Sequence, residues 1–197
     1  DHLHAHLHTQ RRQRHGPEVQ ALRPLEELQF DIQIAADGKL LVGGNFNFFG
    51  VDGRLRYGLV RLYPDGSLDE AFYAGSYSSG GLDGAVYTIL VQPDGRILIG
   101  GAFSQILGSP RQRIARLNAD GSVDATFDPG GGANDKVLTL DRQTDGKIVI
   151  GGAFTAVDDV PAARIARLNA DGTLDAAFAV SAGDIVNAVA VQSDGHI

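Results

Sequence analysis

The sequence contains no cysteine, no methionine and no tryptophan. Without cysteine the chain has no disulfide, no thiolate metal site and no cysteine nucleophile, so either redox compartment suits it. No apolar run reaches the roughly 18 residues that a membrane-spanning helix needs. Because methionine is missing even at position 1, we expect a processed chain, an excised fragment or partly artificial sequence.

Positive charge is also scarce, and the formal net charge is −7. This balance argues against nucleic acid or an anionic membrane as the main partner. The 197 residues are 43% hydrophobic and 21% charged, which is typical of a globular domain or a short array of repeats. The 26 glycines are the strongest compositional feature, because they fall at fixed places along the chain.

One block of sequence recurs about every fifty residues. Its Asp-Gly pairs are 57, 51 and 49 residues apart and begin at Asp37, Asp94, Asp145 and Asp194. In the first three copies a phenylalanine follows that aspartate by nine residues, at Phe46, Phe103 and Phe154. A Gly-Gly pair stands just before it, as in "IGGAF" at 99–103 and again at 150–154.

A second block lies between the copies of the first. It reads "RLYPDGSLDEAF" at 61–72, "RLNADGSVDATF" at 116–127 and "RLNADGTLDAAF" at 167–178. Each time a phenylalanine follows the aspartate of Asp-Gly by seven residues. Lengths vary mainly between the blocks, a pattern typical of strands joined by surface loops.

Each block predicts a β-hairpin. In the second copy, alternating residues lead to Pro93-Asp94-Gly95, where glycine supplies the positive φ that a two-residue hairpin turn needs. Ile97-Leu98-Ile99 then forms an apolar run typical of a buried strand. We therefore expect an all-β fold, a β-propeller of four-stranded antiparallel blades. Gly100-Gly101 should mark a bulge or close backbone approach, and the next phenylalanine should fill the space between blades.

Units of the form "VQPDGRILIGGAF…RIARLNADGSVDATF" closely resemble the delta-60 repeat family. The resemblance covers about residues 28–197 and is strongest at 86–128 and 137–178. It implies a bacterial β-propeller domain, a secreted or cell-surface location and no assigned catalytic residues. The first copy departs from the pattern, since Asn45 replaces the small residue before Phe46.

The repeats divide the chain into a leader at 1–27 and a propeller region at 28–197. Within that region we expect copies at 28–82, 83–134 and 135–183 and a partial copy at 184–197. About three blades and a stub fall short of the roughly 4–8 blades of closed propellers. Three interpretations follow: a piece of a longer protein, a homo-oligomer that closes the ring, or closure with help from the leader.

The leader holds four histidines at alternate positions: His2, His4, His6 and His8. On a strand they would share one face, where imidazoles can bind Zn²⁺ or Cu²⁺. We favour the alternative that residues 1–27 are a linker or artificial sequence without a selected function. A third interpretation makes them a strand of a diverged blade.

Two turns offer oxygen ligands in the spacing of part of a calcium loop. They are Asn118, Asp120 and Asp124, and their counterparts Asn169, Asp171 and Asp175. The bidentate glutamate of such a loop is missing, so we favour Asx turns and no cofactor.

Arginines also recur in register, at Arg113, Arg116, Arg164 and Arg167. They predict either contacts with an anionic glycan or structural pairs with an aspartate such as Asp120 or Asp171. We favour the structural pairs.

No catalytic constellation is visible, because the G-x-S-x-G pattern is absent and five of the six histidines lie in the leader. We therefore expect a non-enzymatic structural or binding module whose loops contact a protein or a glycan. The alternative is a carbohydrate-active enzyme, a hydrolase or lyase, with its site at the central mouth of the propeller. Residues 73–85 break the repeat most strongly and are where we expect a ligand contact.

Overall fold

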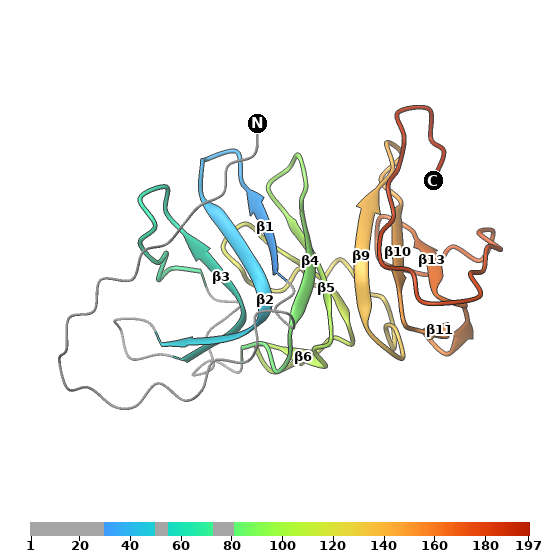
Figure 1. The fold of residues 1–197 in the computed structure, drawn as a ribbon, viewed down its shortest axis with the longest axis horizontal. Helices are drawn as coiled ribbons and strands as arrows, with labels where there is room; N and C mark the ends of the chain where they lie inside the picture. The colour runs from blue at the N-terminus through green and yellow to red at the C-terminus, as the bar shows by residue number, and fades with distance from the viewer. Residues whose placement is uncertain (1–29, 50–54, 73–80) are drawn as a thin grey trace.

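The computed structural model describes residues 30–49, 55–72 and 81–197. Its regular elements in these ranges are all β-strands (Figure 1): β1 Phe30–Ile34, β2 Leu40–Phe49, β3 Leu55–Leu62, β4 Val86–Val91, β5 Ile97–Gly101, β6 Gln105–Ile106, β7 Ser109–Pro110, β8 Ile114–Leu117, β9 Val137–Arg142, β10 Ile148–Gly152, β11 Ala156–Val157, β12 Val160–Pro161 and β13 Ile165–Leu168. Across these ranges no helix is long and apolar enough to cross a membrane.

The strands form three larger antiparallel sheets that follow one another along the chain (Figure 1). The first sheet is β1-β2-β3, the second is β4-β5-β8 and the third is β9-β10-β13. Each sheet is built from one copy of the sequence repeat, so the predicted all-β architecture is confirmed.

The Asp-Gly pairs of the two repeated blocks form the same turn throughout the described residues. In the second sheet Gln92 N–H donates to Arg96 O over 2.8 Å and Gly95 N–H donates to Gln92 O over 2.9 Å. The Asp94 carboxylate accepts from Arg96 N–H, and Gly95 has a φ of +82°. The closing pair encloses three residues rather than the two we expected, but the need for glycine at a positive φ is confirmed.

Each of the three larger sheets has three strands, not the four that we expected of a blade. The segment expected to form the fourth strand of the second repeat meets its sheet at one bridge, Leu117 with Val123. Asp124 then turns the chain, because its carboxylate accepts from Thr126 N–H and its carbonyl accepts from Phe127 N–H. This local turn stops the segment from continuing as a strand. The first and third sheets have matching bridges, Leu62 with Leu68 and Leu168 with Leu174.

Two small hairpins, β6-β7 and β11-β12, were not foreseen from the sequence. Both turn through two residues of positive φ, Leu107-Gly108 and Asp158-Asp159. Only the first carries a glycine, so turn chemistry gave little signal for the second.

The core lies between neighbouring sheets rather than within one. One apolar cluster joins the first and second sheets and includes Phe72 and Phe103. A second cluster joins the second and third sheets and includes Phe127 and Phe154. Phe103 and Phe154 are fully buried, so the predicted role of the phenylalanine after Gly-Gly is confirmed.

The Gly-Gly pairs permit this packing. A Cβ on Gly100 would lie 2.6 Å from Val137 Cγ1 in the next sheet and 2.8 Å from Thr88 Cγ2. A Cβ on Gly101 would collide with the carbonyl oxygen of Ala85, beside a register shift between β4 and β5. Both predicted roles of glycine, close approach and bulge, are therefore present.

The first strands of neighbouring sheets also lie side by side and are joined by side chains. The Asp31 carboxylate on β1 accepts from Ile89 N–H on β4 over 2.6 Å. The partial repeat at 184–197 meets β9 in the same manner, since the Asp141 carboxylate accepts from Val191 N–H over 2.7 Å. These bonds join the first sheet to the second and the third sheet to the partial repeat.

Candidate functional site

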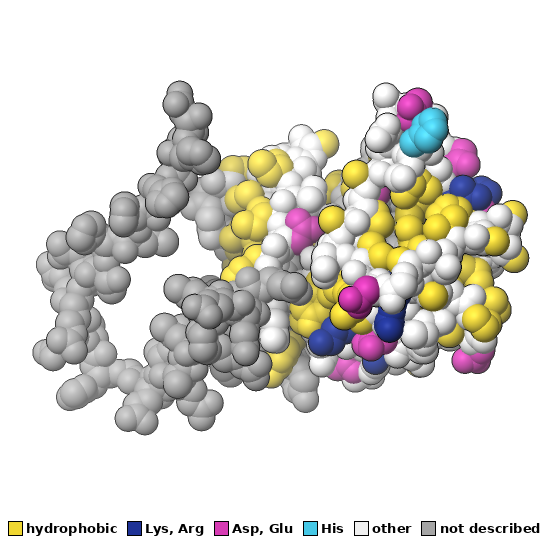
Figure 2. All heavy atoms as spheres, turned by 45° about the vertical axis from the view of Figure 1, so that its right-hand side comes forward, with side chains coloured by type: hydrophobic (Ala, Val, Ile, Leu, Met, Phe, Trp, Pro, Cys, Tyr) yellow, Lys and Arg dark blue, Asp and Glu magenta, His cyan; other side chains and the backbone are white. Residues whose placement is uncertain are grey.

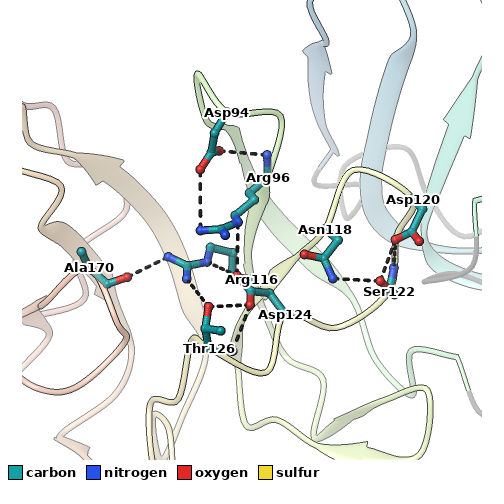
Figure 3. A network of polar contacts seen from close by, with 9 residues as sticks. All are labelled: Asp94, Arg96, Arg116, Asn118, Asp120, Ser122, Asp124, Thr126 and Ala170. Atoms are coloured by element: carbon teal, nitrogen blue, oxygen red, sulfur yellow. Dashed lines mark hydrogen bonds and ion pairs between the residues drawn. The ribbon is translucent and has the colours of Figure 1, made fainter.

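A buried arginine occupies the seam between the second and third sheets (Figure 3). Arg116 Nε donates to Asp124 Oδ2 over 2.7 Å, and Nη2 donates to Thr126 Oγ1 over 3.1 Å. Its Nη1 donates to the carbonyl oxygen of Ala170 in the third sheet over 2.7 Å. The guanidinium also lies over the ring of Phe127, 4.9 Å from its centroid. One side chain thus links two sheets.

The first sheet repeats this arrangement in register. Arg61 Nε donates to Asp69 Oδ2 over 2.8 Å, and Nη1 donates to the carbonyl oxygen of Ala119 in the second sheet. Lys39 Nζ approaches the same Asp69 oxygen at 3.1 Å. Two cations of its own sheet therefore hold the same oxygen of Asp69.

In the third sheet, the hydrogen-bond partners of Arg167 all lie within its own sheet. Its Nε donates to Asp175 Oδ2 over 2.8 Å, and Lys147 Nζ binds the same oxygen at 2.7 Å. Arg167 Nη1 bonds to Gln143 of its own sheet at 3.4 Å instead of to a carbonyl of a following sheet. Its side chain is 21% exposed, against 7% for Arg116.

The expected partners of these arginines were wrong, although the structural role is present. Arg116 and Arg167 pair with Asp124 and Asp175, not with Asp120 and Asp171. The bridge between Leu117 and Val123 sets Arg116 opposite Asp124, and Asp124 N–H donates to Arg116 O over 2.9 Å.

The other two recurring arginines bond to the backbone of their own repeat. Arg113 Nη1 donates to Phe103 O and Arg164 Nη1 donates to Ala153 O. Both residues adopt the left-handed conformation, with φ of +67° and +69°. They thereby place their guanidinium groups against the segment that follows Gly-Gly.

These ion pairs keep the aspartates ionised. Burial raises the pKa of Asp124, but hydrogen bonds from Thr126 and Arg116 outweigh it and lower the pKa from 3.8 to about 2. The Lys147 hydrogen bond, followed by that from Arg167, lowers the pKa of Asp175 to about 2. Both carboxylates are acceptors at neutral pH, not proton donors.

The residues proposed as calcium ligands are engaged in their own turns. Asp120 accepts from Ser122 N–H at 2.9 Å and from Ser122 Oγ at 2.6 Å, and Asn118 donates to Ser122 Oγ at 2.9 Å. Asn169 and Asp171 make the same bonds with Thr173. Asp124 and Asp175 point to arginines instead, so the structure does not bring the three oxygens of either set together around one point.

The remaining sequence candidates fall largely outside the described residues. His2, His4, His6 and His8 lie there, as do residues 73–80 of the repeat-breaking loop. Within the described ranges, no three His, Asp or Glu side chains are grouped as metal ligands.

A cavity of about 770 Å³ opens between the Asp-Gly turns of the first and second sheets. Its apolar wall includes Ile34, Leu41, Val91 and Ile97. Polar side chains of the wall are Asp37, Lys39, Arg61, Gln92 and Asp120. Sequence analysis missed this site, although one signal was present: Ala35 stands where the other repeats have Gln92, Gln143 and Gln192.

Successive antiparallel sheets, packed face to face and joined by the same arginine, define a β-sheet repeat protein. The domain of unknown function (DUF5122) beta-propeller family matches residues 35–72, 92–127 and 143–178, more than half of the chain. The chain belongs to this family. Each matched stretch begins at the Asp-Gly turn after the first strand of a sheet and ends at Phe72, Phe127 or Phe178, so it contains the other two strands of that sheet. The delta-60 name that the motifs suggested stays a prediction.

Comparison with other proteins adds little beyond the family. No curated protein matches the sequence. A solved structure with similarity is that of a protein of unknown function from Bacteroides caccae, determined at 1.35 Å resolution. It is 14% identical, with 78% of this chain and 68% of that chain covered and a TM-score of 0.33.

Proposed function

We propose that the chain is a non-enzymatic structural and binding module, without a resident cofactor, in a secreted or surface protein of a bacterium. Its ligand is a protein or a glycan held by the turns and grooves between blades. The location rests on the resemblance to the delta-60 repeat family alone.

One observation supports this function above the others: the charged residues that recur are bonded to one another within each sheet, and Arg61 and Arg116 also bond to a backbone carbonyl of the next sheet. Asp69, Asp124 and Asp175 each accept from an arginine, with distances of 2.7 to 2.8 Å. Side chains so engaged hold the repeat array together and are poor candidates for a general acid or base, which needs a pKa near the working pH. The repeated chemistry is therefore that of a scaffold.

The exposed end of the third sheet supports association with further blades, including those of a second copy. Ile165 and Phe178 are half-buried there, whereas their counterparts Ile114 and Phe127 are fully buried by the next sheet. Figure 2 shows apolar side chains gathered on this end of the molecule. Val160, Val180 and Ile185 are 47%, 49% and 47% exposed. A partner blade would cover such a surface.

The test measures catalytic turnover, ligand binding and native mass of the 197-residue chain. We expect no turnover of chromogenic glycosides or uronate polysaccharides above buffer, and saturable binding to at least one member of a glycan or bacterial surface-protein panel. Turnover that scales with protein concentration would overturn the proposal in favour of a hydrolase or lyase.

Native mass at several protein concentrations tests whether copies of the chain associate to close a ring. A stable oligomer supports ring closure, and a monomer at all concentrations contradicts it.

A further inference from the structure

Each seam between the three larger sheets joins two kinds of sheet surface. The rear surface of one sheet carries its third strand and the phenylalanine that ends its repeat. The front surface of the next sheet carries its first strand and the phenylalanine after Gly-Gly. In the seam between the second and third sheets, Ile114 and Phe127 come from the rear surface, and Leu140 and Phe154 come from the front surface. All four side chains are at most 7% exposed.

The rear surface of the third sheet is open. Ile165 and Phe178, the counterparts of the buried pair in the second sheet, are only half-buried. Together with Val180 they line a hollow of about 380 Å³. Figure 2 shows apolar side chains gathered on this end of the molecule. The surface therefore has the composition of a seam but lacks the sheet that would cover it.

The front surface of the first sheet, formed by β1, is open as well. Phe30, Ile32 and Ile34 are 50%, 57% and 69% exposed. Ile32 stands where the second sheet has Ile89, which is 2% exposed because it packs on the sheet before it. Phe46 is half-buried, whereas its counterparts in the other two sheets are fully buried. The described chain thus presents one uncovered surface of each kind.

The polar groups of a seam are also present on both surfaces. Across the closed seam, Arg116 donates to the carbonyl oxygen of Ala170, which directly precedes an Asp-Gly turn. Among the described residues, Arg167 finds no such acceptor in a following sheet and bonds within its own sheet. Pro64 of the first sheet occupies the position of Ala170 in its repeat and is exposed. Its carbonyl oxygen is therefore a suitable acceptor for the guanidinium of Arg167.

The partial repeat at 184–197 holds part of this place on the third sheet. The N–H groups of Val189 and Val191 donate to side chains of β9. Ile32 and Ile34 stand at the same two positions of the first repeat, so their N–H groups could take over these bonds. The partial repeat forms no strand among the described residues, whereas β1 pairs with β2 at five positions. An intact first sheet offers the larger surface and should displace the partial repeat.

We propose that a second copy of the chain packs the front surface of its first sheet on the rear surface of the third sheet, and that the contact is reciprocal. One copy supplies three larger sheets, which are too few for a closed propeller. Two copies supply six, within the roughly 4–8 that close a ring. The inference rests on the proposed binding function, of which it names one partner and the surfaces in contact.

Cysteine cross-linking tests the contact directly, because the chain has no cysteine of its own. In the closed seam, Asp128 N–H donates to Asp171 O over 2.7 Å. The corresponding pair between copies is Ala179 and Asp65. In the double variant Ala179→Cys with Asp65→Cys, we expect a disulfide-linked dimer on a non-reducing gel. Each single variant should stay unlinked, and Asp128→Cys with Asp171→Cys should form its disulfide within one chain.

Substitutions on the two surfaces test the association by analytical ultracentrifugation of the 197-residue chain. Ile32→Asp and Ile165→Asp each place a charge in the proposed contact and should raise the dimer dissociation constant at least about tenfold. Ile197→Asp is the matched control, because Ile197 is 46% exposed and belongs to the displaced partial repeat. Val186→Asp weakens the packing of the partial repeat on Gly151 and should strengthen the association.

The outcomes separate this inference from the proposed function. A linked dimer, with an association that Ile32→Asp and Ile165→Asp weaken and Ile197→Asp does not, supports the contact. A monomer at all concentrations, or an association that both surface variants leave unchanged, overturns it. Linked species larger than two copies overturn the reciprocal contact, because an open head-to-tail row would form them. The turnover assay and the glycan and surface-protein panel test the non-enzymatic module independently of these results.

Discussion

Arg116 in the second sheet donates a hydrogen bond to the carbonyl oxygen of Ala170 in the third, 54 residues further along the chain. Arg61 makes the corresponding bond to Ala119 across the preceding seam. Because each arginine is also paired with an aspartate of its own sheet, the contact joins two rigid turns rather than two flexible side chains. The repeat array is therefore coupled through one side chain at each of these seams.

Substitution of that arginine should destabilise the protein. In Arg116→Ala, Asp124 stays buried without its main cation, so we expect a loss of about 3–5 kcal/mol in the free energy of unfolding. Urea denaturation followed by circular dichroism measures it. Arg167→Ala is the matched control, because it removes the same pair without a bond to a following sheet. Its effect should be smaller by about 1 kcal/mol or more, and equal effects would contradict the coupling between sheets.

Acid should weaken the protein through the same aspartates. The pKa values of Asp124 and Asp175 are lowered from 3.8 to about 2, so the unfolded chain takes up protons first as the pH falls. Their contribution to stability is complete above about pH 4 and is lost as the pH falls toward 2. Urea midpoints measured across this range should fall with pH. In Asp124→Asn the fall should be shallower; an unchanged slope would contradict the assignment.

A methyl group added to the first glycine of the Gly-Gly pair should separate two sheets. In Gly100→Ala the new Cβ would lie 2.6 Å from Val137 Cγ1, and we expect a loss of roughly 1–3 kcal/mol from overpacking. Thermal unfolding of the single variant and of Gly100→Ala with Val137→Ala measures the coupling, which should be favourable in the double variant. Gly183→Ala is the control, since its added carbon meets no atom within 4 Å. A similar loss in that control would contradict the steric cause.

Calcium should not affect the stability of the protein. Asp120 and Asp171 bond to Ser122 and Thr173, and Asp124 and Asp175 bond to arginines, so binding would require these contacts to break. We expect equal melting temperatures in millimolar calcium and in a chelator. A rise with calcium that Asp120→Asn abolishes would restore the calcium site, because a ligand of the folded state stabilises it by mass action.

Much of the local structure was predictable because it depends on residues close in sequence. Asp94-Gly95 sets its turn through a carboxylate that bonds two residues ahead and a glycine at positive φ. The fixed nine-residue step to Phe103 then sets the register of the next strand. The phenylalanine and Gly-Gly positions likewise indicated where sheets would meet, since Phe103 packs at the seam with the preceding sheet and Gly100 at the seam with the following sheet.

The sequence by itself determined the turns, the repeat and the all-β class, since these follow from short-range geometry. Tertiary structure decided which partner each charge takes. Arg116 meets Asp124 because one bridge aligns them, while Asp120 is held by Ser122. It also decided that Ala35 and Gln92, 57 residues apart, line one cavity, because only the packing of two sheets brings those turns together.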